Sequence, residues 1–408
     1  MAETLGVTLS GMAYGGDALG RSADGRVIFV PFGLPGEEVR VELTEVHKSW
    51  ARARLAEVLT ASPDRTAPRC RHFGECGGCH YQHMTYAAQL KVKADIVRAQ
   101  LERLGGLKDP PVEATLASPS PWNSRNHLQF SLTAEGRLGF QAAGTRRVIP
   151  ISECHLPEPD LADLWPKIAV APVPGLRRVA LRSGGPGEKM IILQAETEPE
   201  IELTTDLPAS IVWLSLGAAT VLAGRGFLIT HVLGRPFRVS AASFFQVNTS
   251  LVEELVREVL KFLTIQPGEL VFDLYAGVGL FSAFAAQAGA RLLAVEDSPG
   301  ACEDFEVNLE EFDDVELYQA TVEATLPALS QHPDAMVLDP PRAGLGARLI
   351  QHAARLAPPR LVYVSCDPAT LARDGRGLAQ AGYHLEVVVP IDLFPQTFHI
   401  ETISFWRR

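Results

Sequence analysis

The sequence predicts an α/β protein in which a Rossmann-like domain follows two smaller domains, a β-barrel and a mixed α+β domain. Three patterns in the 408 residues lead to this fold class. Short alternating segments fill residues 1–65, a cysteine group opens residues 66–240, and apolar segments alternate with helical ones across residues 241–408. Apolar strands that alternate with helices are typical of a parallel sheet covered on both faces.

Residues 1–65 are expected to form a small β-barrel. Short apolar or alternating segments lie between Gly-rich turns, and residues 37–46 alternate between charged and apolar side chains. Several short strands at such close spacing favour a barrel. Pro63 and Pro68 then break the pattern and place the first domain boundary near residue 65.

The central part of the chain carries a group of cysteines that predicts a metal site. Cys70, Cys76 and Cys79 surround a Gly-Gly pair, and Cys154 follows a predicted helix over residues 83–105. A chain without a signal peptide is expected to be cytoplasmic, where disulfides are rare. Zinc ribbons prefer two separated Cys-x2-Cys pairs, whereas this uneven three-plus-one spacing suits a cubane iron–sulfur cluster better. The spacing therefore favours a [4Fe-4S] cluster, with zinc or no metal as the alternatives.

A glycine-rich turn opens the Rossmann-like pattern. Asp273 lies near the end of an apolar strand, Gly277 and Gly279 follow, and a helical segment begins directly after them. Glycines let the backbone approach a ligand at such a turn, and the helix N-terminus favours negative groups. Ser282 stands where a dinucleotide fingerprint would have a third glycine, which disfavours a nicotinamide-dependent oxidoreductase. Asp273 suits the ammonium group of S-adenosylmethionine, and Glu296, which closes the next strand, suits ribose hydroxyls.

Two more predicted strands end in residues that can carry chemistry. Asp339 ends one of them and is followed by two prolines, at the edge where open α/β sheets bind ligands. Cys366 follows another strand and precedes an Asp-Pro pair. A cysteine beside a cofactor site is in the position of a nucleophile. Cys302, by contrast, lies within a helical segment and is assigned to packing.

Taken together, these motifs resemble the RNA 5-methyluridine methyltransferases. The resemblance spans nearly the whole chain and points to the branch that has an N-terminal TRAM domain and an iron–sulfur cluster and modifies 23S ribosomal RNA. Besides the four cysteines, the matching segments are F-x-Q-x-N at 244–248, DLYAGVG at 273–279, DPPRAG at 339–344, SCDPATLARD at 365–374 and H-x-E at 399–401.

The resemblance implies an OB-like, RNA-binding TRAM domain in residues 1–65, a central iron–sulfur domain in residues 66–240 and an S-adenosylmethionine-dependent methyltransferase domain in residues 241–408. It also implies methylation of C5 of a uridine, in which Cys366 adds to C6 of the base and Glu401 removes the C5 proton. The cofactor contacts would come from Gln246, Tyr275, Glu296 and Asp339, and the cluster ligands from Cys70, Cys76, Cys79 and Cys154.

Three residues depart from the family pattern. Leu280 and Thr321 occupy positions where the family often has asparagine. The resemblance therefore implies that one hydrogen bond to the cofactor is missing at each position. Asp367 replaces the more usual asparagine beside Cys366, and its charge disfavours a thiolate there unless the carboxylate points away. An exposed Phe244 would stack near the flipped uracil, whereas a buried one would be plain core.

The charge distribution indicates how the chain would bind an RNA partner. The net charge is −11, but 23 acidic residues against 11 basic ones in residues 241–408 account for the excess, and residues 1–240 are nearly balanced. RNA binding is then expected to depend on local arginines and stacking more than on bulk charge. The expected substrate is 23S ribosomal RNA, with transfer RNA as the alternative, and the expected state is a monomer without a membrane span. A non-catalytic RNA-binding protein with a structural cluster is the alternative of another class.

Overall fold

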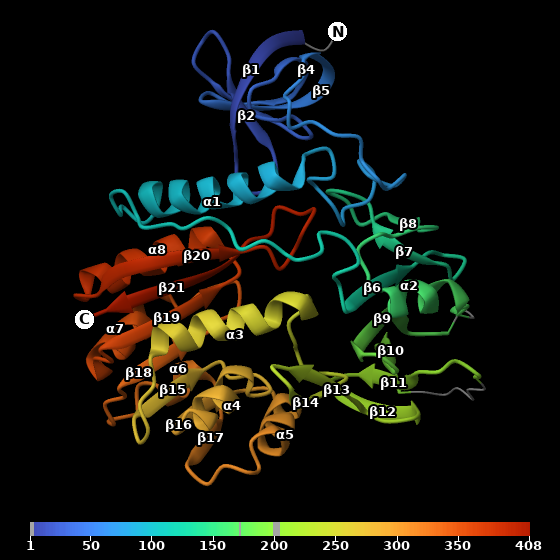
Figure 1. Cartoon of the computed structure of the whole chain (residues 1–408). Coiled ribbons are helices and arrows are strands. Elements are labelled where there is room, and N and C mark those ends of the chain that lie inside the picture. Colours follow the sequence, from blue (N-terminus) through green and yellow to red (C-terminus); the bar gives the residue numbers. More distant parts are fainter. Residues whose placement is uncertain (1–3, 171–172, 199–204) are drawn as a thin grey trace.

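The N-terminal segment folds into the barrel that the sequence predicts. The computed structural model describes residues 4–170, 173–198 and 205–408 (Figure 1). The barrel closes in the order β1-β2-β3-β5-β4, with strands β1 (Thr4–Met12), β2 (Ala18–Arg21), β3 (Val27–Val30), β4 (Glu38–Val46) and β5 (Trp50–Thr60). In β4, Val39 and Val41 are buried in the barrel while Glu38 and Arg40 face solvent. The alternation in the sequence therefore gives the barrel one apolar inner face.

The middle of the chain combines helices with a second sheet. Its helices are α1 (Tyr86–Arg103), α2 (Pro159–Leu164) and the short 3-10 helix η1 (Trp165–Lys167). The sheet has the order β12-β11-β10-β9-β6-β7-β8, with β6 (His127–Leu132), β7 (Leu138–Gln141), β8 (Val148–Pro150), β9 (Leu176–Gly185), β10 (Glu188–Ala195), β11 (Ser210–Ser215) and β12 (Ala218–Ala223). A hairpin of β13 (Phe227–Val232) and β14 (Arg235–Ser240) leads into the last part of the chain. Phe130, Trp165 and Trp213 are buried in the core of this sheet.

The last part of the chain is the doubly wound domain that the alternation predicts. Its sheet has the order β17-β16-β15-β18-β19-β21-β20, with the first five strands parallel and β21 antiparallel to both of its neighbours. The strands are β15 (Leu270–Leu274), β16 (Arg291–Glu296), β17 (Val315–Gln319), β18 (Ala335–Leu338), β19 (Arg360–Ser365), β20 (His384–Ile391) and β21 (Glu401–Arg407). The helices are α3 (Thr249–Leu263), α4 (Leu280–Gln287), α5 (Pro299–Asn308), α6 (Val322–Thr325), α7 (Gly346–Leu356) and α8 (Pro368–Gln380).

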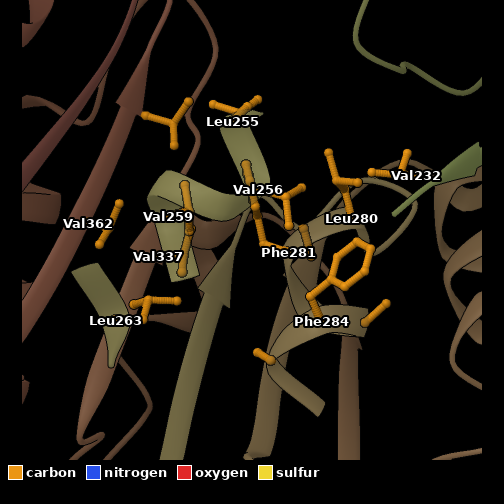
Figure 2. Packing of buried hydrophobic residues seen from close by; sticks show 14 of the residues in the cluster. Val232, Leu255, Val256, Val259, Leu263, Leu280, Phe281, Phe284, Val337 and Val362 are labelled. Atoms are coloured by element: carbon orange, nitrogen blue, oxygen red, sulfur yellow. The ribbon is translucent and has the colours of Figure 1, made fainter. Parts of the chain in front are cut away.

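Helices cover both faces of this sheet. On one face, Val256 and Val259 of α3 share an apolar cluster with Phe284 of α4 and with Val337 of β18 and Val362 of β19 (Figure 2). All five side chains are buried, as the near-continuous apolar character of parallel strands requires. None of the helices within the described ranges combines the length and the apolar content that a membrane crossing needs.

Helix α1 covers the other face and also holds the segment before β21. Figure 1 shows α1 between the barrel and α8, and Val97 of α1 shares a core with Leu371 of α8 and Trp406 of β21. Lys93 is fully buried, and its Nζ donates to Asp392 Oδ1 at 2.5 Å and to the carbonyl oxygens of Phe394 and His399 at 3.0 and 2.8 Å. A buried ammonium needs such a full set of acceptors. The segment that leads to Glu401 is thus fixed by a helix from a distant part of the sequence.

Candidate active site

The chemically active residues of the sheet meet at one edge. Tyr275 follows β15, Glu296 ends β16, Asp339 follows β18 and Cys366 follows β19, so all four lie at the carboxyl ends of parallel strands. Strand β21 runs the opposite way and therefore begins at this edge with Glu401. The β19–β21 register pairs the residues next to Cys366 and Glu401, because Ser365 lies opposite Thr402. The fold thus brings the predicted nucleophile and the predicted base together.

The glycine-rich turn has the features of a cofactor cradle. Asp273 is fully buried, and its Oδ2 accepts a hydrogen bond from Ser282 Oγ at 2.6 Å, while its Oδ1 has no partner among the described residues. Gly279 adopts a φ of 88°, and a Cβ there would lie 2.5 Å from a side-chain atom of Leu309, so no other residue fits. A Cβ on Gly277 would meet nothing within 4 Å, which leaves room beside the backbone. The carboxylate oxygen of Asp273 that has no partner among the described residues could accept a hydrogen bond from the ammonium group of S-adenosylmethionine. The open space beside Gly277 leaves room for the amino-acid part of that cofactor.

Glu296 is fixed by the same turn. Its Oε2 accepts a hydrogen bond from the Gly277 N–H at 2.8 Å, and its Oε1 accepts one from the Ser298 N–H at 2.8 Å. Each carboxylate oxygen keeps a further lone pair. The side chain is therefore a rigid acceptor for a pair of hydroxyl groups.

Two of the three other predicted cofactor residues are Tyr275, which directly follows β15, and Gln246, which precedes α3. Tyr275 has a φ of 68°, a strained value for a non-glycine residue, and its hydroxyl donates to Glu323 Oε1 at 3.4 Å. Gln246 is buried in the loop before α3, where its carbonyl oxygen accepts a hydrogen bond from Asn126 Nδ2 at 3.0 Å. The loop before α3 is therefore attached to Asn126, the residue directly before β6 of the second sheet.

Phe244 and Phe245 divide between surface and core. Phe244 is 66% exposed, whereas Phe245 is packed against the main core and lies 6.3 Å from the Phe237 ring. An aromatic side chain so exposed, two residues before Gln246, is available to stack on a base. Of the two interpretations that the sequence allowed, core packing therefore holds for Phe245 alone.

Carboxyl groups surround the thiol of Cys366. Burial raises the pKa of Cys366 to about 11, and the carboxyl groups of Glu401 and Asp339 add to the rise. The Arg342 guanidinium lowers the pKa of the thiol, and Asp367 raises it slightly further. Burial also raises the pKa of Asp339 to about 7 and raises the pKa of Glu401. Carboxyl groups whose pKa values are raised by burial, next to a thiol, form a site suited to proton transfer.

The four predicted cluster cysteines line one cavity. Cys70, Cys76, Cys79 and Cys154 are free thiols on the wall of a cavity of about 1010 Å³. The loop that carries the first three is attached to the second sheet, since the Gly77 N–H donates to the carbonyl oxygen of Gln141 at 3.0 Å. The Cys76 side chain accepts a hydrogen bond from the Gly78 N–H at 3.4 Å. The sequence prediction that these residues share one site is consistent with this arrangement.

The same cysteines do not form a finished metal site. In the described part of the chain, no group of three or more His, Cys, Asp or Glu residues is arranged to hold a metal ion. Burial raises the pKa of Cys79 to about 12 and that of Cys154 to about 11, so a bound metal would have to displace the protons of these thiols. Metal ligation requires thiolates. The described residues therefore show no assembled ligand group for a [4Fe-4S] cluster or for zinc.

A cation stands beside these thiols. The Arg125 guanidinium lowers the pKa of Cys76, Cys79 and Cys154 against the larger effect of burial, and its buried Nε has no hydrogen-bond partner within the described part of the chain. Arg125 lines the same cavity, together with Phe244. The cysteine cavity is thus continuous with the surface that carries the exposed aromatic ring.

A residue of the barrel that no sequence motif indicated contacts the residue that follows the predicted nucleophile. Tyr14, in the turn between β1 and β2, donates from its hydroxyl to Asp367 Oδ2 at 3.0 Å. The Asp367 carboxylate caps helix α8, because its Oδ1 accepts hydrogen bonds from the N–H groups of Ala369 and Thr370 at 2.9 Å each. Nothing in the local sequence around Tyr14 signals this contact, which joins positions 353 residues apart.

Comparisons with known proteins give a consistent result. A family model described as tRNA (Uracil-5-)-methyltransferase matches residues 231–408, and a TRAM domain model matches residues 2–56. A protein of Streptomyces avermitilis named as an RNA methyltransferase is 33% identical, over 99% of this chain and 98% of its own length. Another protein with that name, from Thermosynechococcus vestitus, is 32% identical over 98% of this chain and 97% of its own.

One solved structure resembles the whole chain. The tRNA (uracil-54, C5)-methyltransferase of Pyrococcus abyssi, in complex with S-adenosyl-L-homocysteine, superposes with a TM-score of 0.74 at 26% sequence identity. The match covers 98% of this chain and 99% of the other. The similarity therefore includes the barrel and the second sheet as well as the doubly wound sheet.

Proposed function

The chain belongs to the family of S-adenosylmethionine-dependent RNA (uracil-5-)-methyltransferases, and on that premise we propose that it methylates C5 of one uridine of 23S ribosomal RNA through a covalent bond between Cys366 and C6 of the base. The observation that carries the mechanism is the meeting of Cys366 and Glu401 at one sheet edge, beside the glycine-rich turn. We also expect the enzyme to act as a monomer in the cytoplasm.

Uracil C5 is a weak nucleophile, so the base must be activated. S-Adenosylmethionine supplies an electrophilic methyl group when it is bound, and Gln246, Tyr275, Glu296 and Asp339 are the residues proposed to hold it. The Cys366 thiolate forms a bond to C6, and the electron pair of the C5–C6 double bond moves toward C5 and O4. The resulting enolate gives C5 the nucleophilic character that methyl transfer requires. Asp339, whose pKa burial raises to about 7, can donate a hydrogen bond that stabilises the enolate oxygen.

The second half of the reaction needs a base. After methyl transfer, C5 carries both the methyl group and its original hydrogen. The Glu401 carboxylate accepts that proton, the C5–C6 double bond forms again, and the C6–S bond breaks to return the Cys366 thiolate. Burial raises the pKa of Glu401, which makes its ionised form a stronger base. A buried carboxyl group opposite the thiol is thus suited to the elimination step.

Two surfaces support RNA as the substrate. The cavity that includes Phe244 is also lined by Arg146, Arg178 and Arg182. A second cavity, of about 710 Å³, lies between the barrel and α1 and is lined by arginines and aromatic rings: Arg21, Arg52, Arg103, Tyr14, Phe29 and Trp50. Arginine and aromatic groups together are typical of sites for unpaired nucleotides. They make it possible for a chain of net charge −11 to bind RNA locally.

Ribosomal RNA and transfer RNA are the two candidate substrates. The four cysteines favour ribosomal RNA through the family resemblance, whereas the named activity of the Pyrococcus abyssi relative favours transfer RNA. We expect mass mapping of cells that lack the gene to show loss of one 5-methyluridine from 23S ribosomal RNA, with transfer RNA unchanged. The wild-type gene should restore the modification, and a gene that carries Cys366→Ala should not. Loss from transfer RNA would reassign the substrate, and unchanged 5-methyluridine in both RNAs would contradict the proposal.

We also propose that Cys70, Cys76, Cys79 and Cys154 bind a [4Fe-4S] cluster when the protein is made with iron and sulfide. Their shared cavity and the Arg125 charge support this proposal, since a cubane with four thiolates is an anion. A cubane also binds each cysteine at a different iron, so its ligands lie farther apart than the ligands of one zinc ion.

Metal analysis tests the cluster. Protein isolated without oxygen is expected to contain about four iron and four sulfide per chain. The Cys79→Ser variant should lose most of both, while Cys302→Ser, which changes a buried thiol of α5, should keep them. Stoichiometric zinc in place of iron would support the zinc alternative, and absence of any metal from the wild-type protein would reject both.

A further inference from the structure

The N-terminal barrel contributes a side chain to the surroundings of the nucleophile. The Tyr14 ring packs edge-on against Phe398, with 5.9 Å between ring centroids and an interplanar angle of 88°. Its hydroxyl donates to Asp367 Oδ2 at 3.0 Å. The contact is partly buried and involves the residue that directly follows Cys366. A barrel expected to bind RNA therefore also touches the catalytic turn.

Asp367 organises the turn that carries Cys366. Its Oδ1 accepts the two N–H groups at the start of α8, and its main-chain N–H and carbonyl oxygen are both within hydrogen-bond distance of Ser365 Oγ, at 3.3 and 3.1 Å. The Thr370 hydroxyl also donates to the Asp367 carbonyl oxygen, at 3.0 Å. With Oδ1 engaged by the helix, Oδ2 is the oxygen that Tyr14 binds. The orientation of this carboxylate therefore depends on both contacts.

The charge balance around Cys366 explains why that orientation matters. The titratable and charged groups that face the thiol are Glu401 of β21, Asp339 and Arg342 after β18, and Asp367 at the start of α8. Three carboxyl groups thus oppose a thiolate, and one guanidinium favours it. Tyr14 brings no charge, and its pKa is raised by burial and by Asp367, so its hydroxyl remains a donor.

We propose that Tyr14 is a positioning residue for Cys366: by binding Asp367 Oδ2, it fixes the turn of the nucleophile and limits how closely the neighbouring carboxylate charge approaches the thiol. The proposal rests on Cys366 being the nucleophile of the proposed function. Asp367 carries a charge directly after the cysteine, so the direction of its side chain affects the thiol. An asparagine at this position would cap α8 without carrying a charge toward the thiol.

The reactivity of the thiol tests the proposal without RNA or cofactor. The rate of alkylation of Cys366 by iodoacetamide is measured against pH by mass spectrometry of the peptide that contains it. Tyr14→Phe keeps the ring against Phe398 and removes the hydroxyl. We expect it to raise the apparent pKa of Cys366 by about 0.5–1 unit, which lowers the alkylation rate below that pKa about three- to tenfold. Asp367→Asn alone should lower the apparent pKa, because it removes one facing charge.

The double variant distinguishes charge from structure. In the Asp367→Asn background, Tyr14→Phe should change the apparent pKa by less than about 0.2 unit, since no carboxylate remains to be held. Tyr383→Phe is the matched control: it removes a buried hydroxyl that donates to the Pro358 carbonyl oxygen, and it should leave the thiol unchanged. Equal shifts in both backgrounds, no shift in the wild-type background, or no effect of Asp367→Asn would each overturn the proposal.

Failure of this inference can be told apart from failure of the proposed function. Alkylation reports only on the thiol, whereas the nucleophile assignment is tested by methyl transfer with Cys366→Ala. If the Cys366→Ala enzyme still methylates RNA, the thiol is not the nucleophile. The measured coupling between Tyr14 and Asp367 would remain valid in that case. A missing coupling with an inactive Cys366→Ala enzyme would reject the positioning role alone.

Discussion

Replacing Cys366 by alanine is expected to abolish methyl transfer while leaving RNA binding within about twofold of the wild-type affinity. Without the thiolate, C5 of the base never gains the electron density that attack on a methyl sulfonium needs. Loss of a catalytic nucleophile lowers turnover by a factor on the order of 10⁴ to 10⁶. Incorporation of labelled methyl groups into RNA measures the first effect, and fluorescence anisotropy with labelled RNA measures the second.

The matched control is Cys302→Ala. This variant also removes a thiol, but one that is buried in helix α5 and contacts only the main-chain carbonyl oxygen of Glu296, at 3.5 Å, among the described hydrogen-bond partners. We expect it to retain methyl transfer and to lose only some stability from packing. Full methylation by the Cys366→Ala enzyme would reject the covalent mechanism, and loss of RNA binding by that enzyme would point to a structural role for the side chain.

The Glu401→Gln variant is expected to accumulate a covalent complex between the enzyme and methylated RNA. The amide cannot accept the C5 proton, so the C6–S bond cannot break once the methyl group has been transferred. The substitution also removes a carboxyl group that raises the pKa of Cys366, and it keeps the shape of a buried side chain, so addition to the base should proceed. Turnover should fall by a factor on the order of 10³ or more.

A denaturing gel with labelled RNA detects this complex as a band of reduced mobility. The double variant Cys366→Ala/Glu401→Gln should give no such band, because it lacks the thiol that forms the bond. The band should also carry label from the methyl donor. Turnover at the wild-type rate by Glu401→Gln would show that another group removes the proton.

The sequence predicted the parts of the fold that depend on local pattern. Strands β15, β16, β18 and β19 are buried apolar runs between helical segments, and their periodicity is evident without a structure. Strand β17 was not predicted, because it lies at a sheet edge and its side chains are half-exposed. The strands β20 and β21 were missed as well, since their place in the sheet is set by antiparallel pairing rather than by alternation with helices.

The site was predicted residue by residue but not as an arrangement. Motifs pointed to Cys366 and Glu401 separately, and only the register of β21 against β19 places one beside the other. The contact from Tyr14 to Asp367 spans 353 positions and has no periodic or motif signal. Such contacts arise from the packing of whole elements, which local sequence rules do not describe.

The buried pair of Lys93 and Asp392 has a consequence for evolution by domain shuffling. The family's catalytic motifs lie in residues 241–408, which suggests a module that recombination could attach to other RNA-binding domains. Yet Lys93 on α1 is the cation that neutralises Asp392, 299 positions later. A gene fragment without α1 would lose this cation together with the apolar face of α1 that shares a core with α8 and β21. Helix α1 must therefore be inherited with the catalytic sheet, and the unit on which recombination can act is larger than the unit that carries the chemistry.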